Sequence, residues 1–209
     1  MKYCLLIASF LCFSLSVIAQ KVAITEHGEE VLLYDDGTWK LKEGPYKETE
    51  ISLNDTLFVK DPTATFLVRS KHIDVGVWIN PKKWTFSTKG DNDDVEYFFR
   101  KKQSDLYGML ITEKIEAPVL TLKELAVSNA QEVSPDLRVV KEEFRTVNGK
   151  QVLMMQMSGT IQGIRISYFG YYYSSKKGSV QFVIYTGQSL FDENRADIEV
   201  LLNGLVELQ

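Results

Sequence analysis

Histidine is scarce in this 209-residue chain, which contains only His27 and His72. A histidine-based catalytic triad or a zinc site needs further side chains that converge on the imidazole. His27 stands in a turn with Gly28 and His72 in the polar stretch "SKHID", and neither has a partner at useful spacing. We interpret both as solvated loop residues. The sequence therefore predicts no catalytic residue, no metal site and no cofactor.

The acidic stretch "GDNDDVE" (90–96) is a candidate calcium loop. Asp91, Asp93 and Asp94 offer the carboxylates that hard cations prefer. A calcium-binding loop also has a central glycine and a final glutamate at fixed spacing, and that spacing is missing here. A solvated acidic turn is the preferred interpretation.

Ser174 and Lys177 match the S-x-x-K motif of serine β-lactam enzymes. That chemistry needs the serine at a helix start and the lysine one turn later. Here the stretch has the pattern of a strand end followed by a Lys-Gly turn, and the companion motifs are absent, so we interpret the match as fortuitous. No motif marks a carboxylate pair for glycoside hydrolysis, and a hydrolase with an unmarked pair is our third functional hypothesis.

The aromatic run "SYFGYYYSS" (167–175) predicts a strand whose alternate side chains point to opposite faces. Ile164 shares its phase with Tyr168, so that phase is predicted to pack inward at its start. The opposite phase, Phe169, Tyr171 and Tyr173, is predicted to face outward. An exposed ladder of this kind suits contact with a protein or a glycan, because tyrosine gives a large contact area at low entropic cost. The alternative is that a helix or loop covers the ladder.

The stretch "LLYDDGTWKL" (32–41) predicts a β-hairpin, because Asp-Gly between β-rich runs favours a tight turn. Asp35 and Asp36 are too few to hold a metal. The turn brings Trp39 back toward the first strand. Trp39 is either a clasp on the main domain or a docking residue in solvent, and we add it to the candidate binding residues.

Residues 1–19 have the pattern of a secretory signal peptide, with Lys2 followed by an apolar run and small residues before Gln20. The alternative, a membrane anchor, needs a longer run. Both cysteines, Cys4 and Cys12, lie in this leader, so the mature chain has no disulfide and no thiolate. Lipidation at Cys12 is disfavoured, because lipoprotein processing needs a small residue before the cysteine. We expect a secreted or periplasmic protein without an integral membrane segment after leader removal.

The composition supports a folded core and excludes some partners. Hydrophobic residues make up 44% and charged residues 25% of the chain, as in ordinary globular proteins. The formal net charge is -4. A mildly acidic chain is a poor candidate for binding nucleic acid or an anionic membrane, because both require a basic surface.

Short strands separated by turn residues dominate the chain. The sequence predicts a β-meander module at 20–43, a linker with at most one short strand at 44–61, and a main domain at 62–209. Helices are predicted from a capping box at Thr121 and from near Asp192. Several strands are apolar on both faces, which favours an α+β fold with an antiparallel sheet covered by helices on both faces.

The order of these elements resembles the PsbP-like superfamily. The resemblance rests on "GVWINPKKWTF" (76–86), then "EYFFRK", a Leu-rich helix, "VNGKQVLMM" and a final "IEVLLNGL" helix. It covers roughly residues 64–208, and Pro81 with Trp84 and the Asn-Gly hairpin are its best motifs. The resemblance implies an α/β/α sandwich and a non-enzymatic binding or assembly role. No partner-binding residue of the superfamily maps onto a distinctive motif here.

Our first hypothesis is a non-catalytic binding or assembly module that acts through protein–protein contacts with an envelope protein. The second is a carrier of a small apolar molecule, with a pocket between sheet and helix. The residues predicted to line that pocket are Trp78, Tyr107, Met154, Met155 and Met157. The oligomeric state and the identity of the partner stay open at this point.

Overall fold

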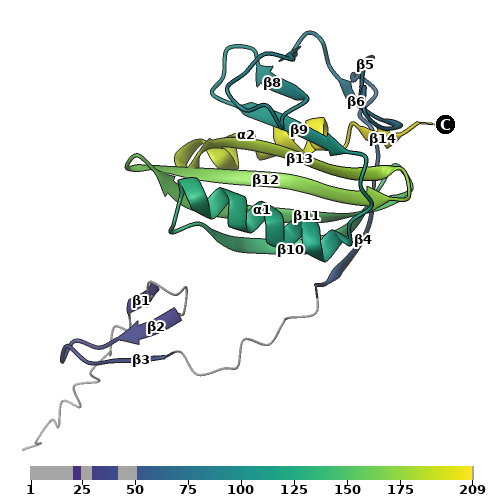
Figure 1. Ribbon diagram of the computed structural model, residues 1–209. Coiled ribbons are helices and arrows are strands. Elements are labelled where there is room, and N and C mark those ends of the chain that lie inside the picture. The colour runs from purple at the N-terminus through teal and green to yellow at the C-terminus, as the bar shows by residue number, and fades with distance from the viewer. Residues whose placement is uncertain (1–20, 25–29, 42–50, 209) are drawn as a thin grey trace, which may run out of the picture. The chain divides into compact units, whose positions relative to one another are not determined.

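The computed structural model describes residues 21–24, 30–41 and 51–208 (Figure 1). They belong to two units, which divide after residue 48. The predicted signal peptide, His27, positions 42–43 of the predicted meander module and positions 44–50 of the predicted linker lie outside the described residues. Within the described part of the chain, no helix is long and apolar enough to cross a membrane.

The N-terminal unit contains the predicted hairpin within a three-stranded antiparallel sheet. Its strands are β1 (Lys21–Ile24), β2 (Glu30–Leu33) and β3 (Trp39–Leu41). Leu33 pairs with Trp39 across β2 and β3. In the turn between them, Gly37 has φ +80°, which suits glycine. The hydroxyl and amide of Thr38 donate to Asp36 Oδ1 at 2.6 and 2.9 Å, and these bonds lower the pKa of Asp36.

The second unit is built on an eight-stranded sheet in the order β4-β10-β11-β12-β13-β9-β8-β7. Its strands are β4 (Leu53–Phe58), β10 (Arg138–Val147), β11 (Lys150–Ile161), β12 (Ile164–Ser175), β13 (Gly178–Gly187), β9 (Tyr107–Glu113), β8 (Tyr97–Lys101) and β7 (Trp84–Ser87). All neighbours are antiparallel except β4 and β10, which are parallel. The sheet is therefore mixed, whereas the sequence predicted an antiparallel one, because a strand from the predicted linker joins its edge.

Two helices and a small antiparallel sheet complete this unit. The helices are α1 (Val119–Val133) and α2 (Gln188–Leu202), and the small sheet has the order β14 (Leu205–Glu207), β6 (Val75–Ile79), β5 (Phe66–Arg69). Both helices begin earlier than predicted. α1 starts directly after Pro118, with no side-chain cap, so the proposed capping box at Thr121 is wrong. Proline is well suited to this place because it sets φ for a helix start.

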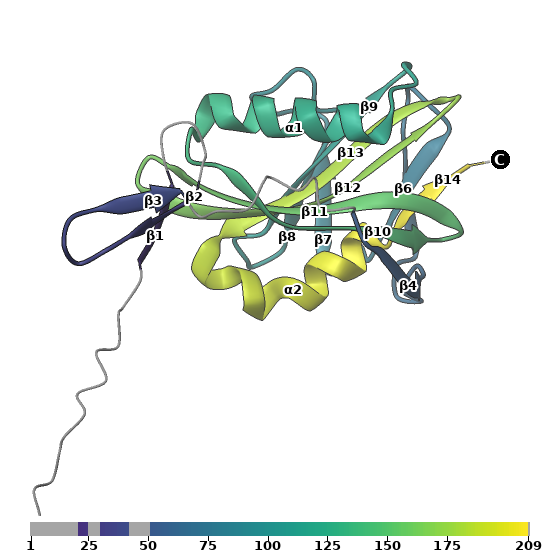
Figure 2. The same cartoon turned by 90° about the horizontal axis from the view of Figure 1, so that it is seen from below.

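The large sheet lies between α1 and α2 (Figure 2), and an apolar core fills the space on each side of it. The α2-side core joins Phe191, Ile198, Leu201 and Leu202 of α2 to the small sheet and to one face of the large sheet. The α1-side core joins residues of α1, including Ala126, to the other face. The α2 side is thus covered by a helix and a sheet together, which differs from the predicted α/β/α sandwich.

The width of the sheet explains this difference. Eight strands at about 4.8 Å spacing span about 34 Å, whereas a helix with its side chains is about 10 Å across. One helix therefore cannot cover a whole face. On the α2 side, the β5-β6-β14 sheet covers a further part of the face of the large sheet. In Figure 1, α1 lies over β10, β11 and β12, and β13, β9 and β8 extend beyond it.

Candidate protein-contact surface

The three aromatic side chains predicted to form an exposed ladder on β12 are buried. Phe169, Tyr171 and Tyr173 are 1%, 0% and 7% exposed, and all three belong to the α2-side core. The prediction that they face solvent is wrong, and the alternative that a covering layer buries them holds. The physical reason is that α2 and the small sheet lie over this face of β12.

The Tyr171 hydroxyl belongs to a polar network around the buried Arg145. It accepts a hydrogen bond from Arg145 Nη1 at 3.2 Å and donates to Asn203 Oδ1 at 2.8 Å. Arg145 also contacts Glu143 at 2.6 Å and Glu199 at 3.4 Å, and its guanidinium lies 4.5 Å from the ring centre of Phe58. Burial raises the pKa of Tyr171 to about 12, against a lowering effect of Arg145. This network ties β4, β10 and α2 together.

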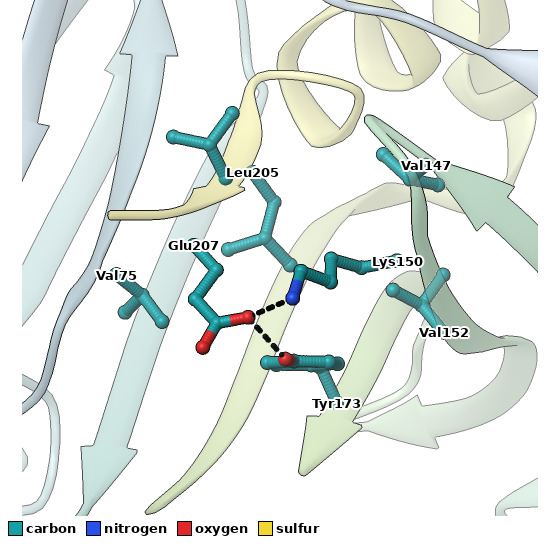
Figure 3. A pocket seen from close by; sticks show the side chains of 8 residues that line it. Val75, Val147, Lys150, Val152, Tyr173, Leu205 and Glu207 are labelled. Carbon is teal, nitrogen blue, oxygen red and sulfur yellow. Dashed lines mark hydrogen bonds and ion pairs between the residues drawn. The ribbon is translucent and has the colours of Figure 1, made fainter. Parts of the chain in front are cut away.

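The Tyr173 hydroxyl is likewise occupied (Figure 3). It donates to Glu207 Oε2 at 3.0 Å, and Lys150 forms an ion pair with the same carboxylate. Burial, followed by the bond to Glu207, raises the pKa of Tyr173. The hollow beside these residues is only about 10 Å³, room for one water molecule. Tyr173 therefore fastens β14 to the sheet and lines no ligand pocket.

The opposite phase of β12 leads to a half-exposed aromatic row. Tyr168 stands directly across from Tyr185 on β13, Tyr185 across from Tyr107 on β9, and Tyr107 across from Arg100 on β8. The three tyrosines are half-buried and Arg100 is exposed. We call these four residues the tyrosine row. The tyrosine row lies on the same face of the large sheet as α1. It lies near the start of β12, where Ile164 is 62% exposed.

Each side chain of the tyrosine row contacts the next one along the row. The rings of Tyr107 and Tyr185 stack at 5.6 Å and 24°, and those of Tyr168 and Tyr185 lie 5.9 Å apart at 37°. The Arg100 guanidinium lies 5.6 Å from the centre of the Tyr107 ring. Such stacking holds the rings in fixed positions before any partner binds.

The hydroxyls of the row differ in their bonding. The Tyr107 hydroxyl contacts Asp105 at 3.4 Å. Within the described residues, the hydroxyls of Tyr168 and Tyr185 make no hydrogen bond and are not sealed from solvent. Burial raises the pKa of both, helped by the neighbouring tyrosine in each case. They are neutral donors at physiological pH, available to a partner.

The sequence contained a signal for this row that we did not use. A tight turn at Lys176-Lys177-Gly178 sets the β12–β13 register, and counting back from the observed pair Ser174–Ser179 places Tyr168 opposite Tyr185. The pairing of β13 with β9 could not be predicted in this way, because α1 and three strands separate them in the chain. Tyr107 and Arg100 therefore could not be joined to the row from the sequence.

The residues predicted to line an apolar pocket do not come together. Met154 lies in the α2-side core, and Met155 and Met157 lie in the α1-side core on the opposite face of the sheet. Tyr107 belongs to the tyrosine row, and Trp78 lines a separate cleft of about 230 Å³. Alternation along β11 separates the methionines, because neighbouring side chains of a strand point to opposite faces.

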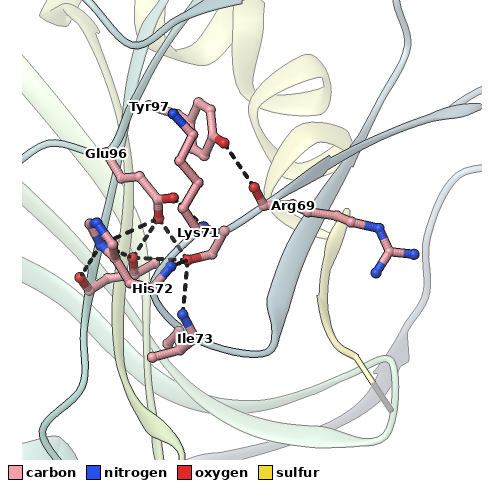
Figure 4. Close-up of polar contacts among 8 residues, drawn as sticks. Arg69, Lys71, His72, Ile73, Glu96 and Tyr97 are labelled. Carbon is pink, nitrogen blue, oxygen red and sulfur yellow. Dashed lines mark hydrogen bonds and ion pairs between the residues drawn. The ribbon is translucent and has the colours of Figure 1, made fainter.

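A second polar cluster surrounds Glu96, which is 8% exposed (Figure 4). Its carboxylate accepts bonds from the hydroxyls of Ser70 at 2.7 Å and Thr112 at 2.5 Å, and from the Lys71 amide at 2.5 Å. His72 Nδ1 lies 3.2 Å from the Thr112 hydroxyl. His72 is an exposed loop residue, as predicted, and its ring also borders this cluster. The Ser70 hydroxyl donates to the Glu96 carboxylate and not to the His72 ring, so the serine–histidine contact of a catalytic triad is missing. We interpret the cluster as a structural link between the two sheets.

The other predicted features have structural roles or remain exposed. Ser174 is the second-last residue of β12, and its hydroxyl accepts a hydrogen bond from the Ala117 amide at 3.2 Å. Lys177 lies in the following turn, as the strand-and-turn interpretation predicted. Asp91, Asp93 and Asp94 are exposed, and no acidic or histidine cluster suited to a metal occurs among the described residues. Trp39 is 58% exposed. Its role as a docking residue stays a prediction.

Comparison with known proteins gives a fold and no closer relationship. No protein family profile and no curated protein matches the chain. The chain is similar to the solved structure of cyanobacterial PsbP (CyanoP) from Synechocystis sp. PCC 6803, with a TM-score of 0.52 and 11% identity over 68% of this chain and 91% of that one. The predicted PsbP-like fold is confirmed by this likeness.

Two further solved structures are more distant in shape. PA94 of Pseudomonas aeruginosa, a protein of unknown function and putative regulator, has a TM-score of 0.44 and 9% identity over 69% of this chain and 97% of that one. LpqN, which is involved in cell envelope biogenesis of Mycobacterium tuberculosis, has a TM-score of 0.48 and 8% identity over 69% of this chain and 90% of that one.

Proposed function

We propose that this protein is a secreted or periplasmic, non-catalytic binding or assembly module that acts through protein–protein contacts, with the tyrosine row as its contact surface. The observation that carries the proposal is the half-buried row of three contacting tyrosines and one exposed arginine, in which Tyr168 also borders the α1-side core. Tyrosine and arginine are enriched at the energetic centres of protein interfaces.

The PsbP-like fold supports this proposal, because the resemblance implies a binding or assembly role. The charge arrangement supports the absence of catalysis. Glu143 and Glu199 converge, but both contact the guanidinium of Arg145, and hydrogen bonds from Asn54 and Arg145 outweigh burial to lower the pKa of Glu143. A carboxyl that is ionised and neutralised by arginine is a poor general acid.

The proposed partner is an envelope protein, since the leader predicts export. Tyr107→Ala and Tyr185→Ala should each weaken partner binding by about 2 kcal/mol, or roughly 30-fold, if the row is the centre of the interface. Placing the photo-crosslinking residue p-benzoylphenylalanine at position 185 in the full-length chain should give one cross-linked product in the native envelope. The Tyr107→Ala substitution should abolish that product.

Phe66 provides a matched control, because it is an exposed aromatic residue at 45% on β5, outside the tyrosine row. A cross-linker at position 66 should not give the same product, and Phe66→Ala should leave it unchanged. Trp39→Ala tests the hairpin separately, and we expect it to weaken capture without lowering the stability of the main unit. If the product cross-linked from position 185 persists in Tyr107→Ala, the row is not the contact surface.

A further inference from the structure

A cleft of about 230 Å³ lies between the loop that follows β4, the β6–β7 region and the end of α2. Its lining is mixed, with two indole rings and several polar groups. The residues are Asp61, Thr63, Ala64, Trp78, Asn80, Lys83, Trp84, Val200 and Leu201. Nothing in the proposed contact function uses this cleft, which does not include the tyrosine row.

The polar groups of the cleft are held in place. The amide and hydroxyl of Thr63 donate to Asp61 Oδ1 at 2.7 and 2.5 Å. These bonds, helped by Lys83 and Lys60, lower the pKa of Asp61, so the carboxylate is ionised. Asn80 Oδ1 accepts a hydrogen bond from the backbone amide of Lys82 at 2.9 Å. In each case one oxygen fixes the side chain and leaves its other polar atom for a ligand.

Three polar atoms in the cleft make no hydrogen bond within the described residues: Asp61 Oδ2, Asn80 Nδ2 and the indole nitrogen of Trp84. The Trp84 side chain is only 3% exposed, and its indole nitrogen is not among the fully buried atoms without a partner. Asp61, Asn80 and Trp84 therefore bring one acceptor and two donors to the lining of the cleft, together with the Trp78 indole.

The fixed charges select the class of ligand. The ammonium of Lys60 lies 5.2 Å from the Trp78 ring centre and takes the place that an organic cation would need over this ring, while Lys83 borders the cleft and pairs with Asp197 at 2.9 Å. The carboxylate of Asp61 repels an anion. Lys60 also donates to the carbonyls of Asp61 and Ala64, at 3.3 and 3.2 Å, and so is engaged already. A neutral ligand with several hydroxyls meets neither obstacle.

The size of the cleft points the same way. Pockets for drug-sized molecules are about 300–1,000 Å³, so 230 Å³ suits one sugar ring. A pyranose presents C–H groups on one face, which pack on an indole, and hydroxyls at its rim, which both donate and accept. We propose that this cleft is a binding site for a single neutral sugar residue, either free or at the end of an envelope glycan.

The test uses the three tryptophans of the full chain as reporters. Glucose and N-acetylglucosamine are titrated into 15N-labelled protein, with choline and glutamate as charged probes of similar size. The indole signals of Trp78 and Trp84 should shift saturably with a neutral sugar, with a dissociation constant on the order of 1 mM. The Trp39 signal should not move, since Trp39 is not among the residues that line the cleft.

Two variants assign the binding to the cleft. Trp78→Ala should weaken sugar binding about tenfold, and Asp61→Asn, which keeps the size and the Thr63 contacts, should weaken it several-fold. Tyr107→Ala should bind sugar as the wild type does, and Trp78→Ala should keep the cross-linked partner, so either proposal can fail alone. No saturable shift with either sugar, tighter binding of choline or glutamate, or unchanged affinity in both cleft variants would overturn the sugar site.

Discussion

Tyr171 and Tyr172 are neighbours on β12 whose hydroxyls have opposite surroundings. Both side chains are 0% exposed. The Tyr171 hydroxyl has two partners, Arg145 and Asn203, whereas the Tyr172 hydroxyl in the α1-side core has none within the described residues. A buried hydroxyl without a hydrogen-bond partner lowers the free energy of unfolding, whereas a buried hydroxyl that is hydrogen-bonded raises it. Adjacent tyrosines in one strand should therefore respond differently to the same substitution.

We expect Tyr171→Phe to lower the free energy of unfolding by about 1–2 kcal/mol, because it removes two hydrogen bonds and leaves part of the Arg145 network unpaired. Tyr172→Phe should leave the free energy of unfolding unchanged or raise it by up to about 1 kcal/mol. Urea denaturation of the two variants at neutral pH measures both values. A loss in Tyr172→Phe as large as that in Tyr171→Phe would contradict this account.

The same pair makes stability depend on alkaline pH. Burial raises the pKa of Tyr171 from 10.0 to about 12 and also raises that of Tyr172. Below pH 10 both groups are protonated in the folded and unfolded states, so their contribution is constant. From pH 10 toward 12 the unfolded chain ionises first, and each group lowers stability by about 1.4 kcal/mol per pH unit. In Tyr171→Phe this slope should be smaller than in the wild type, while the slope below pH 10 stays the same.

At the scale of elements, the end of α2 is joined to the small sheet through Gly204. The helix ends at Asn203, and β14 begins directly after Gly204 and pairs with β6. A Cβ at position 204 would overlap the carbonyl oxygen of Trp78 and lie 2.9 Å from that of Leu201. Backbone atoms cannot move aside as a flexible side chain can, so glycine is required for this close approach.

We expect Gly204→Ala to lower the free energy of unfolding by about 1–3 kcal/mol, the usual cost of overpacking. Gly187→Ala at the other end of α2 is the matched control, because no atom lies within 4 Å of the added Cβ. It should be neutral or stabilise by up to about 1 kcal/mol. Thermal and urea unfolding of both variants distinguish them, and equal losses would show that helix-end entropy rather than the contact with Trp78 matters.

At the scale of the whole molecule, the boundary between the two units precedes β4. β4 pairs with β10, Asn54 donates to Glu143 at 3.0 Å, and the Lys60 amide donates to Asn148 at 2.9 Å. Phe58 also packs on the α2-side core. This strand therefore belongs to the main unit by its contacts, although it lies in the stretch that the sequence predicted as a linker.

We expect a chain that starts at Thr49 to unfold with the same free energy as the main unit of the full chain. A chain that starts at Asp61 should lose several kcal/mol, because Arg145 and Glu143 lose β4 as cover and Phe58 leaves the core. Urea unfolding monitored by near-UV circular dichroism measures the difference. Equal stability of the two truncated chains would show that β4 is dispensable to the fold.

Much of the succession of strands along the chain could be predicted from the sequence, because local signals determine where each strand lies. Alternating hydrophobicity and turn residues such as Asn148-Gly149, which have positive φ values of 47° and 79°, indicate the short strands that dominate the structure. The apolar character of β11 on both faces correctly indicated a strand covered on both sides. The PsbP-like fold followed from the order of these elements.

Only the tertiary structure decided which face of β12 is covered more completely. Periodicity fixes that Tyr168 and Tyr171 point in opposite directions, but the direction itself depends on what packs on each face. The α2 side carries a helix and a sheet, so Tyr171 is buried; the α1 side carries one helix on an eight-stranded sheet, so Tyr168 is half-exposed. The tyrosine row and the cleft at Trp78 both join residues from distant strands, and long-range pairing of that kind leaves no signal in a single local stretch of sequence.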